Sequence, residues 1–372
     1  MEAVVGTTKS CYIHIPFCKK ICSYCDFCKV FYNEKYVKNY LNSLEKEIKE
    51  KYQGEKLETI YIGGGTPSVL SIDELKYLFK IISIFHKEDK YELTIECNFD
   101  SLTKDKLLLF KENGVNRLSL GLQTTDYNVL NKLNRDLDLK YVKELIRYSK
   151  SIGLNNINID LMYAFPFSNM DILKQDIEFI LSLDIKHIST YSLIIEKNTK
   201  LYIDNIKNIS EDIDLEMYNY IHNKLIENGY RHYEISNFAK EKYQSKHNLV
   251  YWKNKSYYGF GLSASSYINN ERITNTRSIT KYINNNIDRT VEQLNINDKM
   301  VYEMILGLRL DEGVSLEQFY LKYNKRITEV FNIEELIKNK YLVIEDDHLK
   351  VPFDKWYVIN SILVSFLEVN NG

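Results

Sequence analysis

Six short apolar runs, each followed by a longer amphipathic stretch, constrain the fold of this chain more than any other feature. Runs of this length between turn residues indicate buried strands. The six predicted strands are residues 11–17, 59–63, 92–96, 117–123, 156–165 and 187–195. Strands that alternate with helices in series predict a parallel sheet with right-handed crossovers. The sequence therefore favours an α/β fold built as an incomplete, TIM-like (β/α)6 barrel.

The stretches between the predicted strands carry apolar residues at helical spacing. Leu75, Leu78 and Ile82, for example, fall on one face of a helix. The four residues from Ser71 to Glu74 are typical of a capping box that starts this helix. The predicted helices are residues 33–52, 71–85, 103–113, 139–153 and 171–184.

Three cysteines follow the first predicted strand at the spacing C-x3-C-x2-C, as Cys18, Cys22 and Cys25. Thiolates are the usual ligands of iron–sulfur clusters, and a [4Fe–4S] cluster normally takes four of them. A run of three indicates one iron without a protein ligand, which leaves an open position for a cofactor or substrate. Two other interpretations stay open here: a zinc site that recruits His14 or Cys28, and a disulfide, which a chain without an export signal disfavours.

With its flanks, the cysteine run resembles the cluster loop of radical S-adenosylmethionine (SAM) proteins. The residues from Tyr12 to Phe17, Tyr-Ile-His-Ile-Pro-Phe, and the pair Asp26-Phe27 are similar, more narrowly, to the HemN/HemW group of oxygen-independent coproporphyrinogen III oxidases and heme chaperones. The resemblance extends over about residues 11–367. It implies a [4Fe–4S] cluster held by the three cysteines, with SAM bound to the fourth iron.

Polar and glycine residues lie at the ends of predicted strands, where barrels of this kind place their active groups. A glycine-rich turn, residues 63–67, follows the second strand, and Asp160 lies in the apolar fifth strand, where an uncompensated carboxylate is costly. An ordinary turn and a buried salt bridge are the alternatives for these two features. The SAM contacts that the resemblance implies are Tyr12, Gly64, Gly65, Thr66, Glu96, Gln123, Arg135 and Asp160.

A polar and aromatic block, residues 230–266, follows the sixth predicted strand. Such a surface suits a flat porphyrin with an imidazole as iron ligand, and an irregular segment packed on the barrel is the alternative. Residues 247–252 are His-Asn-Leu-Val-Tyr-Trp and match the signature His-Asn-x-x-Tyr-Trp of the heme-chaperone branch. The resemblance therefore implies heme bound near His247 and Tyr251.

From about residue 297 the pattern changes to short helices and one hairpin. The helices are predicted at residues 298–310, 315–323, 334–339 and 358–367, and the hairpin at residues 342–351. This arrangement resembles the C-terminal, winged-helix-like domain of the family. We predict three parts: a partial barrel at residues 1–210, a barrel-capping segment at residues 211–296, and the C-terminal domain at residues 297–372.

Charge and hydropathy restrict the partners. The formal net charge is −2 and no basic stripe is present, so we expect no nucleic-acid binding. No run reaches the ~18 apolar residues that span a bilayer, and the first ten residues lack an export signal. We expect a protein without membrane insertion that works in the reducing cytoplasm, which suits an oxygen-sensitive cluster.

Within the family, the sequence favours a heme chaperone that transfers heme to acceptor proteins, with an electron donor for the cluster. The cluster loop begins near residue 1, and Asp26-Phe27 stands where the oxidases carry a fourth cysteine. Cys28 comes one position late and is predicted to be a spare thiol. The alternatives are an oxidative decarboxylase of coproporphyrinogen III and, less favoured, a radical SAM heme-degrading enzyme.

Overall fold

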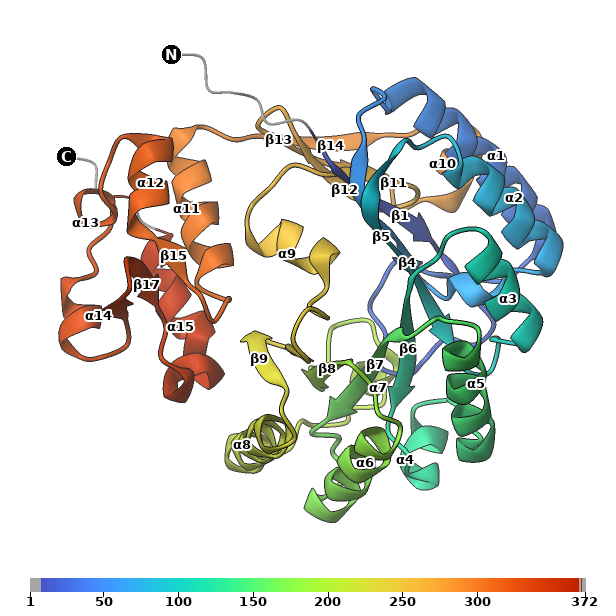
Figure 1. Cartoon of the computed structure of the whole chain (residues 1–372), viewed down its shortest axis with the longest axis horizontal. Helices are drawn as coiled ribbons and strands as arrows, with labels where there is room; N and C mark the ends of the chain where they lie inside the picture. Colours follow the sequence, from blue (N-terminus) through green and yellow to red (C-terminus); the bar gives the residue numbers. More distant parts are fainter. Residues whose placement is uncertain (1–7, 368, 370–372) are drawn as a thin grey trace.

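The computed structural model describes residues 8–367 and 369 and has the predicted α/β architecture (Figure 1). A curved nine-stranded sheet has the order β11-β1-β4-β5-β6-β7-β8-β10-β9. Its six central strands are β1 (Ser10–Ile15), β4 (Leu57–Gly64), β5 (Lys87–Asn98), β6 (Arg117–Gln123), β7 (Asn156–Tyr163) and β8 (His187–Ser192). These six run parallel to one another, and every residue of β6 is buried. The predicted six-unit partial barrel is thus confirmed.

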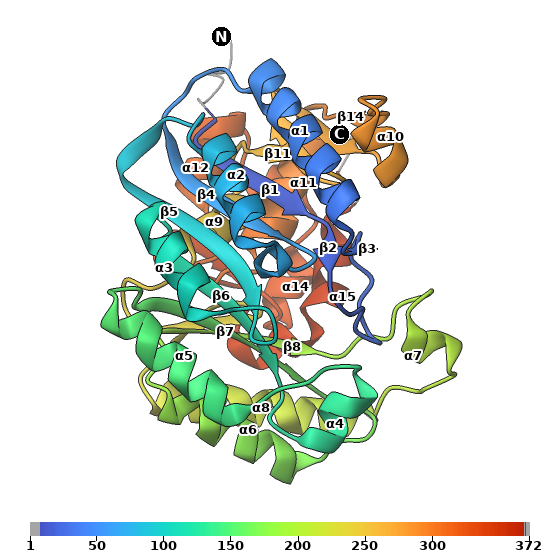
Figure 2. The ribbon, with the colours of Figure 1, turned by 90° about the vertical axis from the view of Figure 1, so that its right-hand side faces the viewer.

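Helices cover the convex outer face of the sheet, as Figures 1 and 2 show. They are α1 (Glu34–Lys51), α2 (Ile72–Ile82), α3 (Lys104–Glu112), α4 (Tyr127–Lys132), α5 (Leu139–Ser151), α6 (Met170–Ser182) and α8 (Glu211–Glu227). The capping box of α2 is confirmed, because Ser71 N donates to Glu74 Oε2 at 2.7 Å and Glu74 N donates to Ser71 Oγ at 3.3 Å. The short helix α4 was not predicted.

The first predicted strand is shorter than the sequence indicated. β1 ends at Ile15, because Pro16 has no backbone N–H to continue the ladder. The next two residues form β2 (Phe17–Cys18), which pairs with β3 (Val30–Phe31) in a separate two-stranded sheet. The cysteine run therefore leaves the barrel sheet at this point and lies over the carboxyl ends of its strands.

The chain between the sixth strand and the C-terminal helices crosses the open side of the barrel (Figure 1). On one edge of the sheet, β10 (Asn237–Ala239) pairs antiparallel with β8, and β9 (Arg231–Glu234) pairs antiparallel with β10. On the other edge, β11 (Tyr258–Phe260) lies parallel to β1. Helix α9 (Lys246–Trp252) lies between these two edges. None of the three edge strands was predicted, since each is only three or four residues long.

A small three-stranded sheet and one short helix are added to the barrel. A three-stranded sheet of β12 (Ser265–Ile268), β13 (Glu271–Asn275) and β14 (Arg289–Gln293) includes the short helix α10 (Ile279–Ile283) in its last connection. A short helix, α7 (Lys200–Ile203), follows β8.

The C-terminal unit is helical with a small sheet, as predicted. Its helices are α11 (Ile296–Gly307), α12 (Leu316–Tyr323), α13 (Ile327–Val330), α14 (Glu334–Lys338) and α15 (Ile359–Leu363), with 3-10 turns at Phe353–Val358 and Val364–Phe366. Its sheet consists of β15 (Val314–Ser315), β17 (His348–Lys350) and β16 (Val343–Glu345). The unit joins the edge of the barrel through a bridge between Glu234 and Leu310. No helix in the described part of the chain is long and apolar enough to cross a membrane.

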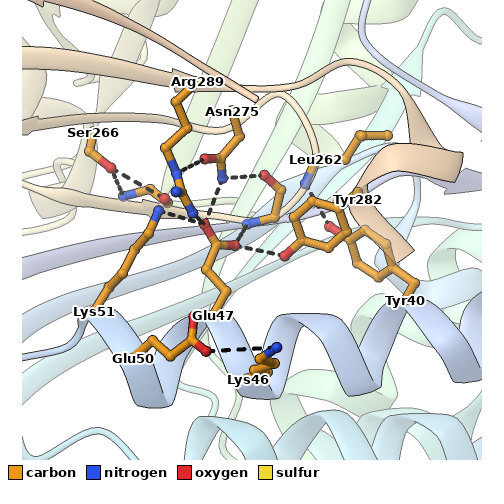
Figure 3. A network of polar contacts seen from close by, with 12 residues as sticks. Tyr40, Lys46, Glu47, Glu50, Lys51, Leu262, Ser266, Asn275, Tyr282 and Arg289 are labelled. Atoms are coloured by element: carbon orange, nitrogen blue, oxygen red, sulfur yellow. Dashed lines mark hydrogen bonds and ion pairs between the residues drawn. The ribbon is translucent and has the colours of Figure 1, made fainter. Parts of the chain in front are cut away.

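A fully buried carboxylate on α1 holds the three-stranded sheet against the barrel (Figure 3). The partners of the Glu47 carboxylate are Gly261 N at 2.9 Å, Tyr282 OH at 2.7 Å, Asn275 Nδ2 at 2.8 Å, Lys51 Nζ at 2.9 Å and Arg289 Nη2 at 3.6 Å. Beside it, Tyr40 OH donates to the carbonyl of His14 and accepts from Leu262 N. The end of β1 and the later sheet are therefore fixed to one helix.

We predict that Glu47→Ala lowers the free energy of unfolding by roughly 3–5 kcal/mol, since it leaves buried donors and two cations without their acceptor. The matched control is Glu50→Ala on the same helix. Glu50 makes only an exposed contact with Lys46 at 3.9 Å, so its loss should cost less than about 1 kcal/mol. Urea titration of both variants checks this, and equal losses would contradict a structural role for the Glu47 network.

Candidate cofactor-binding site

A cavity of about 470 Å³ opens at the carboxyl ends of the central strands, and all three cysteines of the run border it. Cys18 belongs to β2, and Cys22 and Cys25 lie in the loop between β2 and β3. Cys28 does not border the cavity, and its Sγ lies 3.8 Å from the carbonyl of Arg277. The structure thus separates the fourth cysteine of the region from the other three, in line with its prediction as a spare thiol.

The cysteine loop is held by segments that are distant in the sequence. Ser23 N donates to the carbonyl of Leu133 at 3.1 Å, and Leu201 N donates to the carbonyl of Ser23 at 3.1 Å. Tyr24 packs against an apolar cluster of Val129, Leu133, Met162, Phe165, Leu193 and Leu201. The loop is therefore anchored to α4, β7 and α7, which come from the opposite half of the barrel.

Two polar side chains face the sulfur atoms. Thr66 Oγ1 lies 3.7 Å from Cys18 Sγ, and Arg135 Nη1 lies 3.5 Å from Cys22 Sγ. Burial raises the pKa of Cys18 to about 11, with the Thr66 hydrogen bond opposing the rise, so iron binding has to displace the proton. Among residues 8–367 and 369, no group of three or more His, Cys, Asp or Glu side chains is arranged around a single metal ion.

The glycine turn after β4 packs directly against the end of β1. A Cβ atom on Gly65 would lie 2.8 Å from the carbonyl oxygen of Phe17, and one on Gly64 would lie 2.6 Å from the His14 ring. Gly64 also has φ = 117°, a conformation that side chains disfavour. The two glycines therefore allow the turn to approach the start of the cysteine run, and both border the cavity.

Two carboxylates face the cavity, one from β5 and one from β7, on either side of β6. Glu96 accepts hydrogen bonds from Tyr61 OH at 2.8 Å and from Gly64 N at 2.9 Å, and burial raises its pKa to about 7. Asp160 accepts from Asn158 Nδ2 at 2.7 Å, and burial raises its pKa as well. Neither carboxylate has an ion-pair partner among the described residues, so the predicted alternative of a buried salt bridge at Asp160 is wrong.

Gln123 and Arg135 also line the cavity, at the carboxyl end of β6. Gln123 ends β6 at a register shift and has φ = 70°, which is rare for a residue with a side chain. Arg135 is half-buried, and its Nη2 donates to Gly121 O at 2.8 Å and to Asn98 Oδ1 at 3.0 Å. The resemblance implies that Arg135 contacts SAM, and in the structure its protein contacts hold it between β6 and the cysteine loop.

Tyr12 lies behind the wall of the cavity and does not border it. Its hydroxyl bonds to His14 Nδ1 at 2.9 Å, and His14 Nε2 bonds to the carbonyl of Cys28 at 2.8 Å. Both ring nitrogens of His14 are thus occupied, which leaves none for the alternative zinc site. Of the eight predicted SAM contacts, seven line the cavity, and the eighth, Tyr12, bonds to His14 outside it.

The histidine and tyrosine of the His-Asn-x-x-Tyr-Trp signature are turned into the protein. His247 is 1% exposed, its Nδ1 bonds to Thr59 Oγ1 at 2.8 Å, and its Nε2 bonds to Tyr251 OH at 2.8 Å. The backbone N–H of His247 donates to Glu92 at 3.1 Å, so α9 closes the end of the barrel opposite to the cysteines. Only Asn248 of this helix borders the cavity. The assignment of His247 and Tyr251 to heme stays a prediction.

Several cavity residues escaped the sequence prediction. The inner wall also carries Tyr61, Arg117, Ser119, Asn158 and Ser189. The signal was present in β6, where alternation puts residues 117, 119, 121 and 123 on one face of the strand. Because Arg117 is on the same face of the strand as the predicted contact Gln123, the sequence alone indicates that its side chain faces the interior of the barrel.

Three cysteines and a glycine turn around one cavity of a partial barrel are the arrangement of radical SAM proteins. The model of the Radical SAM superfamily matches residues 12–180, and that of the HemN C-terminal domain matches residues 294–352. The chain is 40% identical to the heme chaperone HemW of Bacillus subtilis over 87% of this chain and 89% of that protein. It is 37% identical to HemW of Lactococcus lactis over 96% of this chain and 97% of that protein.

The chain belongs to the HemW family. Membership of the radical SAM superfamily implies a [4Fe–4S] cluster and SAM as its cofactors. The coproporphyrinogen III oxidase HemN of Escherichia coli has the same fold, with a TM-score of 0.86 over 96% of this chain and 90% of that chain at 21% identity. At this identity the likeness concerns the fold alone.

We predict that Cys18→Ala, Cys22→Ala and Cys25→Ala each abolish most of the iron and sulfide that the anaerobically reconstituted protein binds, because each removes one ligand of the cluster. Cys28→Ala is the matched control, since its thiol lies outside the cavity. Chemical analysis of iron and sulfide per chain checks the four variants. Loss of iron in Cys28→Ala to the same degree would contradict the assignment.

Proposed function

We propose that this protein is a heme chaperone, which binds heme, a [4Fe–4S] cluster and SAM and transfers the heme to acceptor proteins. The observation that carries the proposal is the single cavity that brings Cys18, Cys22 and Cys25 together with the glycine turn. The family supports it, since curated relatives at 40% and 37% identity are named heme chaperones. The reducing cytoplasm is the compartment that suits such a cluster.

In this proposal different cavity residues bind different parts of the cofactors. Cys18, Cys22 and Cys25 would hold three irons of the cluster and leave the fourth iron for SAM. The cluster and SAM together would supply one-electron chemistry. Glu96 and Asp160 provide carboxylates that the positive sulfonium group of SAM would stabilise in their ionised form, in a site where charges interact more strongly than in water. Gly64 and Gly65 keep the wall free of side chains next to the cluster.

Heme binding at His247 requires a local change in the structure. Both ring nitrogens have protein partners, and burial lowers the pKa of His247 to about 3, so the ring is neutral and able to ligate iron once it is released. Release breaks the bonds to Thr59 and Tyr251 and moves α9 away from β4. We therefore expect heme binding to be slow and coupled to the opening of α9.

The deciding experiment offers heme, and separately coproporphyrinogen III with SAM and a reductant, to the anaerobically reconstituted protein. We predict heme uptake, followed by transfer to an apo-hemoprotein, without turnover of coproporphyrinogen. Turnover without heme uptake would overturn the proposal in favour of the oxidase, whose fold this chain shares over 96% of its length.

Two variants in the same titration locate the heme. His247→Ala should weaken heme binding about tenfold or more while the iron content of the cluster is unchanged. Thr59→Val removes the hydrogen bond to the ring but keeps the imidazole, so its heme affinity should equal or exceed that of the wild type. An equal loss in both variants would show that His247 acts by packing and would remove it from the heme site.

A further inference from the structure

Arg117 is a buried cation without a described partner. The residue is 2% exposed, and no described residue accepts a hydrogen bond from its Nε. It borders the cavity together with Ser119 and Gln123 from the same face of β6. Leaving a buried charged donor unpaired costs more free energy than one hydrogen bond returns, so such a group calls for a ligand or ordered water.

The other cations that border the cavity are engaged by the protein. Lys20 pairs with Asp136, and Lys29 Nζ donates to the carbonyl of Cys25. The guanidinium of Arg135 is shared among Cys22, Asn98 and Gly121. Arg117 is therefore the cavity-lining cation whose side chain forms neither an ion pair nor a hydrogen bond with the described residues.

Two more unpaired polar atoms lie next to Arg117. Thr94 on β5 and Asn156 on β7 are its partners in the sheet register, and both Thr94 Oγ1 and Asn156 Oδ1 are buried without a hydrogen bond to any part of the chain that the structure describes. All three side chains point to the same side of their strands. One layer of the barrel thus leaves three neighbouring polar atoms unsatisfied.

The two carboxylates that border the cavity do not pair with Arg117. Glu96 and Asp160 are influenced by its charge through space, but neither forms an ion pair with it. Glu96 instead accepts from Tyr61 and Gly64. The guanidinium retains donors for a group that enters from the cavity.

We propose that Arg117 binds a carboxylate of the molecule that occupies the cavity. Guanidinium binds carboxylate through two parallel hydrogen bonds, and such a charge-assisted pair is about twice as strong as a neutral one. The inference rests on the proposed function for the identity of the ligands, which gives two sources of the same chemistry: the aminoacyl carboxylate of SAM and a propionate of heme.

The test measures the affinity of four ligands for the full-length, anaerobically reconstituted protein. SAM is compared with decarboxylated SAM, and heme with its dimethyl ester, in the wild type and in Arg117→Gln. For one of the two ligand pairs, removing the carboxylate should weaken wild-type binding by at least about tenfold more than it weakens Arg117→Gln binding. The pair that responds identifies the source of the carboxylate.

Arg147→Gln on the exposed side of α5 is the matched control for the loss of one positive charge and should behave as the wild type. Arg117→Lys keeps the charge without the planar fork, so its carboxylate dependence should lie between the wild type and Arg117→Gln. If Arg117→Gln fails to fold, the comparison is made with Arg117→Lys alone.

A carboxylate dependence that is the same in the wild type and in the Arg117 variants, for both ligand pairs, would overturn the inference. That result would leave the proposed function intact, because the wild type would still bind SAM and heme. If the wild type binds heme in neither form, the proposed function fails, and the SAM pair alone decides the role of Arg117.

Discussion

The contact between the glycine turn and the end of β1 is the constraint on which the cavity depends. Gly65 lies so close to Phe17 that no side chain fits between them, and the close approach puts Thr66 beside Cys18. A turn with ordinary side chains would move away from the cysteine run and open the wall. The loop itself is anchored on the opposite half of the barrel through Ser23, so the cavity is closed from two sides.

The interior of the barrel is polar, and its charges are placed by strand alternation. Glu96, Asp160 and Arg117 come from three neighbouring strands and share one cavity without pairing. Burial raises the pKa of both carboxyl groups, with Glu96 at about 7, so a positively charged ligand would stabilise their ionised forms. Such a site suits a molecule that carries a positive and a negative charge, as SAM does. At the end of the barrel opposite to the cysteines, His247 packs on Thr59 and closes the interior.

The parts of this fold that were predictable from sequence have strong local signals. The six central strands are apolar and regular, and the cysteines at 18, 22 and 25 have the spacing of a cluster loop. The edge strands β9, β10 and β11 are short and rich in polar and aromatic residues, and they are strands only because β10 pairs with β8, β9 pairs with β10 and β11 pairs with β1. The sequence did not indicate a role for Arg117, because that role depends on the lack of a hydrogen-bond partner among the described residues, which no local pattern reveals. In the same way, the burial of His247 follows from the position of α9, which no local pattern encodes.

The central claim is that three cysteines leave one iron free and that SAM binds there, in the cavity they share with Glu96 and Gln123. Electron paramagnetic resonance of the reduced, reconstituted protein tests it most directly. The account predicts the spectrum of a [4Fe–4S] cluster whose g values shift when SAM is added, because SAM changes the ligands of one iron. A spectrum that is the same with and without SAM, at concentrations where SAM binding is independently measured, would contradict it.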